Sequence, residues 1–299
     1  MAGLDISVVM AANNPGAAIA ECLESLARQT FFSRAEVIVA ECSTDGTGAR
    51  IRTEFPWVTL LHFDRPVGLP ELMKEAMRQA RGKVMAVTDP HCVFPPDLLE
   101  KLFRAHQSDY AVIGGAVENG RSEQLLDWAC YFADYAAFML PSARRATFVL
   151  AGNHVTYKSW VIKEALDSME GGFRKVFFHW ELERRGVRFL FDPELVVYYA
   201  RRNTFAGFMR GYYQHAWLFA AVRTKRMSVA ARFMRIITVP ALPAFLLYQR
   251  IRPALGKKRN RGKLLLSIPL LALFVTAWAT GELKGYLLGP TSLSGEIYR

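Results

Sequence analysis

Cysteine is scarce in this sequence of 299 residues. The four cysteines stand singly, and none belongs to a Cys-x-x-Cys pair or has the spacing of zinc ligands. This pattern argues against a disulfide framework and against a structural zinc site, so we expect reduced, mostly buried thiols. The N-terminal stretch also lacks the charged start and the long apolar run of a signal peptide, and we expect the front of the chain to stay in the cytoplasm.

Acidic residues are absent from a long stretch towards the C-terminus. No Asp or Glu occurs from Leu195 to Gly281, whereas the same stretch holds 15 Lys and Arg. Residues 1–194 hold 21 Lys and Arg against 25 Asp and Glu, a net charge of −4, although the whole chain carries +11. The cations flank apolar runs, which favours an anionic membrane surface over nucleic acid as the partner.

Unbroken apolar runs of the roughly 20 residues that a spanning helix needs are also lacking. Ile236–Leu247 and Leu264–Thr280 are shorter, and we expect the prolines inside them to break both. The loop between them, Arg250–Lys263, holds seven cations and is expected on the cytoplasmic side. A re-entrant or in-plane hairpin and a pair with one spanning helix both fit this pattern. Two buried helices of a soluble domain are the alternative.

The front of the chain alternates β-rich runs with segments of helical spacing. This alternation predicts an α/β fold, Rossmann-like, with a mainly parallel sheet over residues 1–204. Polar clusters follow two of the runs, at 41–47 and 88–91. We expect both clusters at the carboxyl edge of the sheet, where such folds bind ligands. From residue 205 aromatic residues alternate with arginines, so residues 205–299 are predicted to form an amphipathic and apolar, membrane-associated helical tail.

Short motifs in the front of the chain resemble those of a known family. The opening Ile6–Met10 and the run Ala35–Thr47, which contains Ser-Thr-Asp-Gly-Thr, resemble the start of family 2 glycosyltransferases with the GT-A fold. Gly152–Tyr157 is similar to its GGN segment, and Gly171–Phe173 to the segment that leads to its catalytic helix. Thr88-Asp-Pro-His-Cys and the ending Ala277–Pro290 resemble a membrane-tailed bacterial subgroup. The resemblance implies an inverting transferase of the cell envelope that uses a nucleotide-sugar donor, most often a UDP-sugar.

The resemblance assigns Glu41 and Asp45 to the nucleoside of the donor, with Gly152 and Asn153 facing donor and acceptor. Carboxylates accept hydrogen bonds from ribose hydroxyls and from a base N–H, which fits this role. A solvated loop acid and a helix cap are the respective alternatives.

The resemblance also implies a divalent cation, Mn²⁺ or Mg²⁺, held by an Asp-x-Asp motif against the diphosphate. The chain has Asp89-Pro90-His91 there, so only Asp89 is a carboxylate. His91 is either the second metal ligand or a packed loop histidine.

The general base is ambiguous in the sequence, because two ways of counting compete. Counting forward from Gly171–Phe173 gives Glu181, whose alternative is a surface acid that pairs with Arg184 or Arg185. The resemblance implies that the base belongs to an acidic pair at the start of a helix. Counting back from Gly186, the glycine that ends this helix, puts the pair at Arg174-Lys175, which would leave no carboxylate base. His179 is a further candidate, because its ordinary pKa suits proton transfer.

Taken together, the sequence predicts a transferase at the cytoplasmic face of the inner membrane, with a membrane lipid or polyprenyl phosphate as acceptor. A degenerate GT-A-like protein that binds without catalysis is the first rival. An α/β protein that binds nucleic acid through the basic tail is the second, and the apolar runs speak against it.

Overall fold

The structure is a computed structural model, and it describes residues 4–224 and 227–289. The chain divides into two compact units. The first, called the sheet unit here, comprises residues 1–120 and 140–201. The second, the helical unit, comprises residues 121–139 and 202–299.

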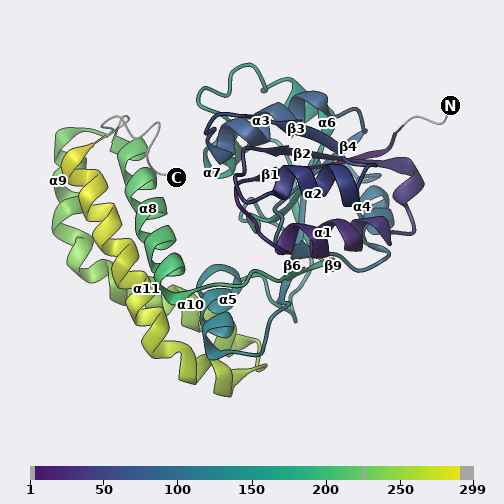
Figure 1. Ribbon diagram of the computed structural model, residues 1–299. Coiled ribbons are helices and arrows are strands. Elements are labelled where there is room, and N and C mark those ends of the chain that lie inside the picture. The colour runs from purple at the N-terminus through teal and green to yellow at the C-terminus, as the bar shows by residue number, and fades with distance from the viewer. Residues whose placement is uncertain (1–3, 225–226, 290–299) are drawn as a thin grey trace. The chain divides into compact units, whose positions relative to one another are not determined.

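The sheet unit contains one mixed sheet (Figure 1). Its strands are β1 (Ile6–Ala12), β2 (Ala35–Glu41), β3 (Thr59–His62), β4 (Val84–Thr88), β5 (Cys92–Val93), β6 (Val112–Asn119), β7 (Arg145–Ala146), β8 (His154–Lys158) and β9 (Phe189–Tyr199). The strand order is β3-β2-β1-β4-β8-β6-β9-β5, and β7 pairs with β9. The first four strands are parallel to one another, β6 is parallel to β9, and β8 runs antiparallel between β4 and β6.

The central strands of the sheet are buried along their whole length. All seven residues of β1 and all five of β4 are buried, as expected for central parallel strands covered on both faces. The helices of this unit are α1 (Ala18–Ala27), α2 (Thr47–Glu54), α3 (Leu69–Gln79), α4 (Leu98–Ala105), α6 (Ser159–Lys163) and α7 (Lys175–Arg184), with a 3₁₀ turn η1 (Phe32–Arg34). The predicted α/β class with a mainly parallel sheet is confirmed.

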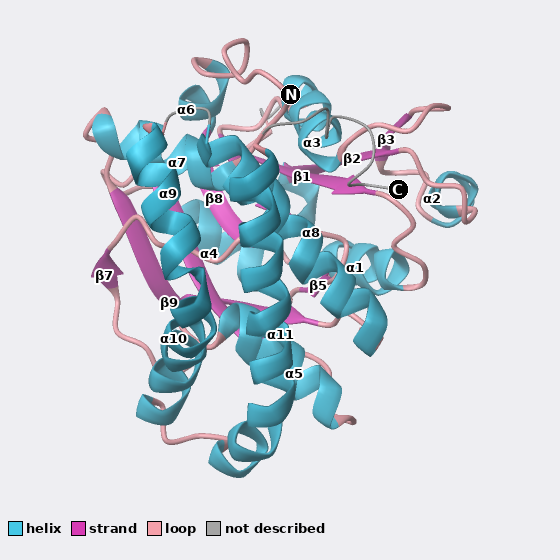
Figure 2. Ribbon diagram, turned by 90° about the vertical axis from the view of Figure 1, so that its left-hand side faces the viewer, coloured by secondary structure: helices cyan, strands magenta, loops and turns pink. Residues whose placement is uncertain are grey.

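The helical unit consists of helices (Figure 2). They are α5 (Leu125–Tyr135), α8 (Phe205–Thr224), α9 (Val229–Thr238), the 3₁₀ turn η2 (Val239–Ala241), α10 (Leu242–Gly256) and α11 (Arg261–Leu288). Helix α11 packs along α8, and it also contacts α5 and α10. The two apolar runs thus form a helical hairpin, as expected.

The segment before residue 140 is the main surprise in the division of the chain. The sequence predicts a single front domain over residues 1–204 and does not single out α5. In the structure α5 belongs to the helical unit, where Tyr212 donates a hydrogen bond to Asp134 at 2.7 Å. The signal for this helix was present, because Gln124 and Asp127 form a reciprocal capping box at its start.

The expectation that prolines break both apolar runs is wrong for the second run. Helix α11 continues through Pro269 for 28 residues. Leu271, Phe274 and Val275 follow directly and are buried, so tertiary packing outweighs the one lost backbone hydrogen bond. In the first run, Val239 and Pro240 lie in a 3₁₀ turn between α9 and α10, so there the helix does change.

Two stretches pass the length and hydropathy test for membrane spans among the described residues. They are Val229–Gly256 and Arg261–Leu288, and within the apolar 18-residue window of each stretch 6% and 44% are buried, respectively. Large apolar side chains stand exposed on both, among them Phe233, Phe245 and Leu266. Lys225 and Arg226, two of the cations counted in the tail, lie outside the described residues.

Candidate active site

The carboxyl ends of β1, β2 and β4 form one edge of the sheet, because β1 pairs in parallel with both neighbours. The loops that follow β1 and β2 are joined by hydrogen bonds. The Asn14 amide N–H donates to the Ser43 hydroxyl at 3.0 Å, and the Thr44 N–H donates to the Asn14 side-chain oxygen at 2.9 Å. The polar clusters predicted at this edge therefore sit where the sequence placed them, and Asn14 is an anchor that sequence reasoning missed.

Glu41 lies at the end of β2 and is fully buried. One carboxylate oxygen accepts a hydrogen bond from the Ser43 N–H at 2.7 Å, and the other contacts Nδ1 of His62, at the end of β3. Gly48 lies so close that a Cβ there would overlap this carboxylate. Glu41 thus organises the β2 loop from within, and its carboxylate is already engaged by protein groups.

Asp45 stands at the tip of the β2 loop and is exposed. One oxygen accepts from the Thr47 hydroxyl at 2.6 Å and from the Thr47 N–H at 3.1 Å, so Asp45 caps the start of α2. The other oxygen accepts from the Gly16 N–H at 3.1 Å. Partial burial raises the pKa of Asp45, but the hydrogen bonds from Thr47 and Gly16 outweigh it and hold the pKa below its usual range. The next residue, Gly46, has a φ of +86°, which explains the glycine in this motif.

Asp89 follows β4 and turns the chain. Its Oδ1 accepts hydrogen bonds from the His91 N–H at 3.0 Å and from the Cys92 thiol at 3.6 Å. The Nδ1 atom of His91 is buried and has no hydrogen-bond partner within the part of the chain that the structure describes. Burial lowers the pKa of His91, Asp89 opposes this, and Arg201 adds to it. His91 therefore offers a neutral ring with an unused nitrogen.

This arrangement fits a divalent cation in donor type, because it combines a carboxylate with an unused imidazole nitrogen. No group of three or more His, Cys, Asp or Glu side chains that could hold a metal occurs among residues 4–224 and 227–289. Asp89 and His91 would thus supply only part of the coordination. Phosphate oxygens of a ligand and water would have to complete it, as is common for Mg²⁺ sites.

Asn153 lies beside this turn. Its backbone oxygen accepts from the Thr88 hydroxyl at 3.1 Å and from the Cys92 thiol at 3.6 Å, so the residue borders the end of β4. The side chain is buried, and neither its oxygen nor its nitrogen has a hydrogen-bond partner among the described residues. A buried amide without a partner is costly, so it points to a polar ligand. Gly152, one residue earlier, is exposed.

Lys175, the first residue of α7, faces the same segment. Its Nζ donates a hydrogen bond to the backbone oxygen of Leu150 at 2.7 Å, and a Cβ on Gly152 would lie 3.7 Å from that nitrogen. Burial lowers the pKa of Lys175 to about 7. If the acidic pair of the family corresponds to Arg174-Lys175, as the count back from Gly186 predicts, its second position is occupied by an amine near Gly152.

Glu181 and His179, the two predicted bases, have other partners. The Glu181 carboxylate pairs with Arg184 and Arg185, both at 2.9 Å, in the arrangement of a helix-surface acid. His179 is buried, shares a hydrogen bond of 2.7 Å between its Nε2 and the Tyr157 hydroxyl, and makes a further hydrogen bond with the backbone of Phe148. Burial lowers the pKa of His179 to about 3, and the nearby Lys175 adds to this. This geometry gives His179 the contacts of a core residue.

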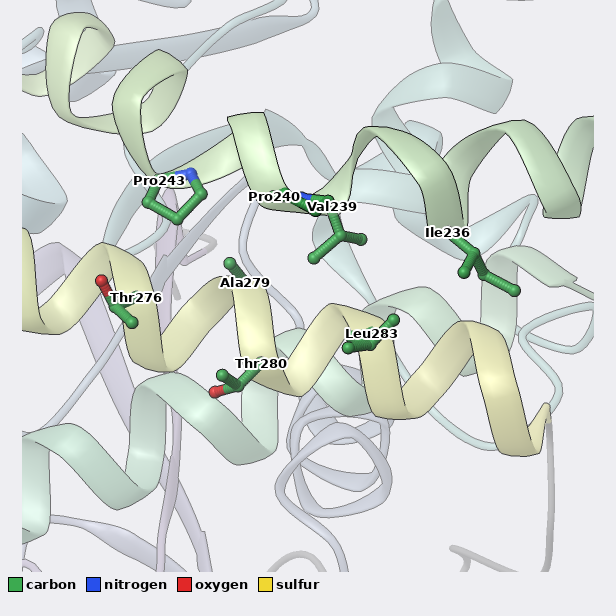
Figure 3. A pocket seen from close by; sticks show the side chains of 8 residues that line it. All are labelled: Ile236, Val239, Pro240, Pro243, Thr276, Ala279, Thr280 and Leu283. Carbon is green, nitrogen blue, oxygen red and sulfur yellow. The ribbon is translucent and has the colours of Figure 1, made fainter.

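An apolar groove lies within the helical unit, between η2 and α11 (Figure 3). Its volume is about 250 Å³, and its lining residues are Ile236, Val239, Pro240, Pro243, Thr276, Ala279, Thr280 and Leu283. The hydroxyls of Thr276 and Thr280 donate to backbone oxygens of their own helix, at 2.8 and 2.9 Å. These threonines therefore present little unpaired polarity, and the groove suits an apolar occupant.

Comparisons with known proteins give the family and the fold of this chain. The sequence profile of the family described as "Glycosyl transferase family 2" matches residues 7–169, more than half of the chain. The chain belongs to this family. Among solved structures, it resembles a mannosyltransferase, PcManGT from Pyrobaculum calidifontis, in complex with GDP-Man and Mn2+. The TM-score is 0.58 at 19% identity, over 93% of this chain and 86% of that one. No curated protein sequence matches significantly. The family 2 transferase thus has the GT-A fold that its motifs predicted.

Proposed function

We propose that this glycosyltransferase moves a sugar from a nucleoside diphosphate sugar to a lipid-linked acceptor at a membrane, with inversion at the anomeric carbon. The observation that carries the proposal is the unpartnered, buried amide of Asn153 beside the Asp89 turn. Asp45 and Asn14 fix the neighbouring loops at the same edge of the sheet. An amide, two acids and tied loops suit a ligand that carries hydroxyls, a base and phosphates.

Two nucleotides are candidates for the donor, UDP and GDP. The resemblance of the motifs favours a UDP-sugar, whereas the structurally similar PcManGT is bound to GDP-Man. Asp89 and His91 would hold the divalent cation, which, when bound, offsets the negative charge of the leaving diphosphate.

Binding of the nucleotide provides the first test. We expect titration calorimetry of the full chain in detergent to detect UDP or GDP in the presence of Mn²⁺, and D89N to weaken that binding about 10-fold or more. D167N is the matched control, because the Asp167 side chain is 98% exposed and its ion pair with Arg78 is long, at 3.8 Å. If neither nucleotide binds, the proposal fails.

The lipid acceptor rests on the helical unit. The 15 cations without an acid from Leu195 to Gly281 would attract anionic headgroups, and the exposed apolar side chains of α9 and α10 would enter the acyl region. The groove beside Ala279 would take one hydrocarbon chain of a membrane lipid. The basic loop supports the cytoplasmic face of the membrane as the location of the protein, by the positive-inside rule.

Membrane association is tested with vesicles. We expect the protein to float with phosphatidylcholine vesicles that contain phosphatidylserine, and to do so less with phosphatidylcholine alone. Release of nucleoside diphosphate from UDP-glucose or GDP-mannose should then increase when a membrane lipid extract is added. Recovery of the whole protein in the soluble fraction without detergent would contradict this part of the proposal.

The rival function is a binding protein of the same fold without catalysis. The pairing of Glu181 with Arg184 and Arg185, and the amine of Lys175 beside Gly152, are the observations that favour it. Nucleotide binding without release of nucleoside diphosphate from either donor would support the rival.

A further inference from the structure

Lys175 occupies a position that is unfavourable for a cation. It is the first residue of α7, where the unpaired N–H groups of a helix create a partial positive charge. The first turn of α7 contains no acidic residue. Within the described residues, no carboxylate forms an ion pair with its ammonium group, and the contact of Nζ is the Leu150 backbone oxygen. The surroundings of Lys175 therefore favour the neutral amine.

The amine is nevertheless held beside the candidate site. One of its hydrogens is donated to the backbone oxygen of Leu150 at 2.7 Å, and a Cβ built on Gly152 would lie 3.7 Å from the nitrogen. The next residue, Asn153, carries the buried amide without a partner and contacts Thr88 through its backbone. A short chain of contacts thus links the Lys175 nitrogen to the end of β4 and the Asp89 turn.

We propose that the neutral amine of Lys175 is the general base of the transfer reaction and takes the role that a carboxylate would otherwise fill. This inference rests on the proposed glycosyl transfer. The alternative acid, Glu181, is engaged by two arginines, and His179 is enclosed in the core by Tyr157.

The step balances with the groups named. The acceptor in this step is a hydroxyl: its oxygen attacks the anomeric carbon of the donor sugar, and its proton passes to the lone pair of the Lys175 nitrogen. A new bond forms between that oxygen and the anomeric carbon. The bond from the anomeric carbon to the diphosphate oxygen breaks, and its electron pair leaves with the nucleoside diphosphate. The Lys175 ammonium then returns its proton to water.

The charged and titratable neighbours are consistent with this role. His179 lies one turn further along α7 and is neutral, because burial lowers its pKa to about 3. Burial likewise lowers the pKa of Lys175 to about 7, so a large share of the amine is unprotonated in neutral solution.

The first experiment needs no substrate. Competitive labelling of the full chain with acetic anhydride between acid and alkaline pH, read out by peptide mass spectrometry, measures the titration of each amine. We expect Lys175 to gain reactivity at a pH well below that of free Nα-acetyl-lysine in the same mixture. Titration of Lys175 together with the free amine would overturn the proposal. Because no donor is present, this result is independent of whether the proposed function holds.

The second experiment separates a base from a cation that contacts phosphate. We expect K175M and K175R to bind UDP or GDP like the parent but to release nucleoside diphosphate from the sugar donor about 100-fold more slowly or worse. K175R fails because arginine stays protonated. K175E should recover most of the rate, with a pH profile displaced towards acid.

The control is K74R, because the Lys74 ammonium also donates to a backbone oxygen, that of Met169, at 3.0 Å. It should turn over at the parental rate. Full activity of K175R would overturn the proposal that Lys175 is the general base. Loss of nucleotide binding in K175E with retention in K175R would overturn it as well, and would show instead that Lys175 binds the diphosphate as a cation. Nucleotide binding by the parent without any turnover would also overturn it, whereas absence of nucleotide binding would refute the proposed function itself.

Discussion

The backbone N–H of Gly16 donates a hydrogen bond of 3.1 Å to the carboxylate of Asp45, and this bond ties the loop after β1 to the loop after β2. The other carboxylate oxygen caps α2 through Thr47. One side chain therefore fixes two loops at the edge of the sheet. It can do so fully only while it is ionised, because each of these bonds is donated to it.

The first prediction concerns the pH dependence of this link. The pKa of Asp45 in the folded chain is below its unfolded value of 3.8, so the stability that it contributes is present above that pH and is lost as the pH falls through the folded pKa. We expect D45N to lower the melting temperature at neutral pH and to match the parent in strong acid. Calorimetric melting over pH checks this. A pH-independent difference would contradict it.

Buried histidines give the second prediction. Burial lowers the pKa of His106 and His179 to about 3 and that of His154 to about 4, from an unfolded value of 6.5. The unfolded chain therefore binds more protons, and the sheet unit should lose stability as the pH falls from 6.5 towards these values. Each histidine contributes up to about 1.4 kcal/mol per pH unit.

The measurement is the free energy of unfolding from denaturant titrations at several pH values. H106Q should be less stable than the parent at neutral pH, because His106 shares a hydrogen bond of 2.7 Å with Thr156. Its slope against pH should, however, be shallower by the share of one histidine. An unchanged slope would show that His106 does not titrate on unfolding.

The packing of α8 against α11 gives the third prediction. A Cβ on Gly285 would lie 2.5 Å from the backbone oxygen of Trp217 and 2.6 Å from the Cβ of Ala220. The helices must separate to admit even a methyl group, so G285A should destabilise the helical unit by about 1–3 kcal/mol. G211A is the matched control, because a Cβ on Gly211 meets no atom within 4 Å. Thermal unfolding in detergent distinguishes the two, and equal melting temperatures would refute the close packing.

The fourth prediction concerns Glu181. Its pairs with Arg184 and Arg185 lie on the helix surface, and such pairs contribute only about 0.3–0.5 kcal/mol each. We expect E181Q to change stability little and to release nucleoside diphosphate at close to the parental rate. A loss of about 100-fold, with nucleotide binding intact, would instead make Glu181 the base that the forward count predicted.

Local patterns were enough to predict the front of the fold. The strands β1, β2 and β4 are short runs of buried apolar residues that end in polar loops, and both features are visible in the sequence. The edge occupied by Asp45 and Asp89 followed from the topology of parallel sheets.

The start of α7 could not be settled in the same way. The two counts differ only in the length of the loop before the helix, and nothing in the residues fixes that length. Burial decides the partners of each candidate, and burial depends on long-range packing: Lys175 meets Leu150, 25 positions away, and His179 meets Tyr157, 22 positions away. The roles of Glu181 and Lys175 accordingly stay predictions, to be separated by the variants above.

The path of the chain has a practical consequence for anyone who shortens this protein. Residues 121–139 leave the sheet unit, contribute α5 to the helical unit and return at residue 140. Trp128, Tyr131 and Phe132 of α5 are buried in the intact chain. Truncation after Arg201 to obtain a soluble catalytic fragment would remove the helices that contact α5. It would leave the apolar side chains of α5 exposed to solvent in the middle of the remaining polypeptide. A fragment that behaves well in solution would also have to replace this excursion with a short linker.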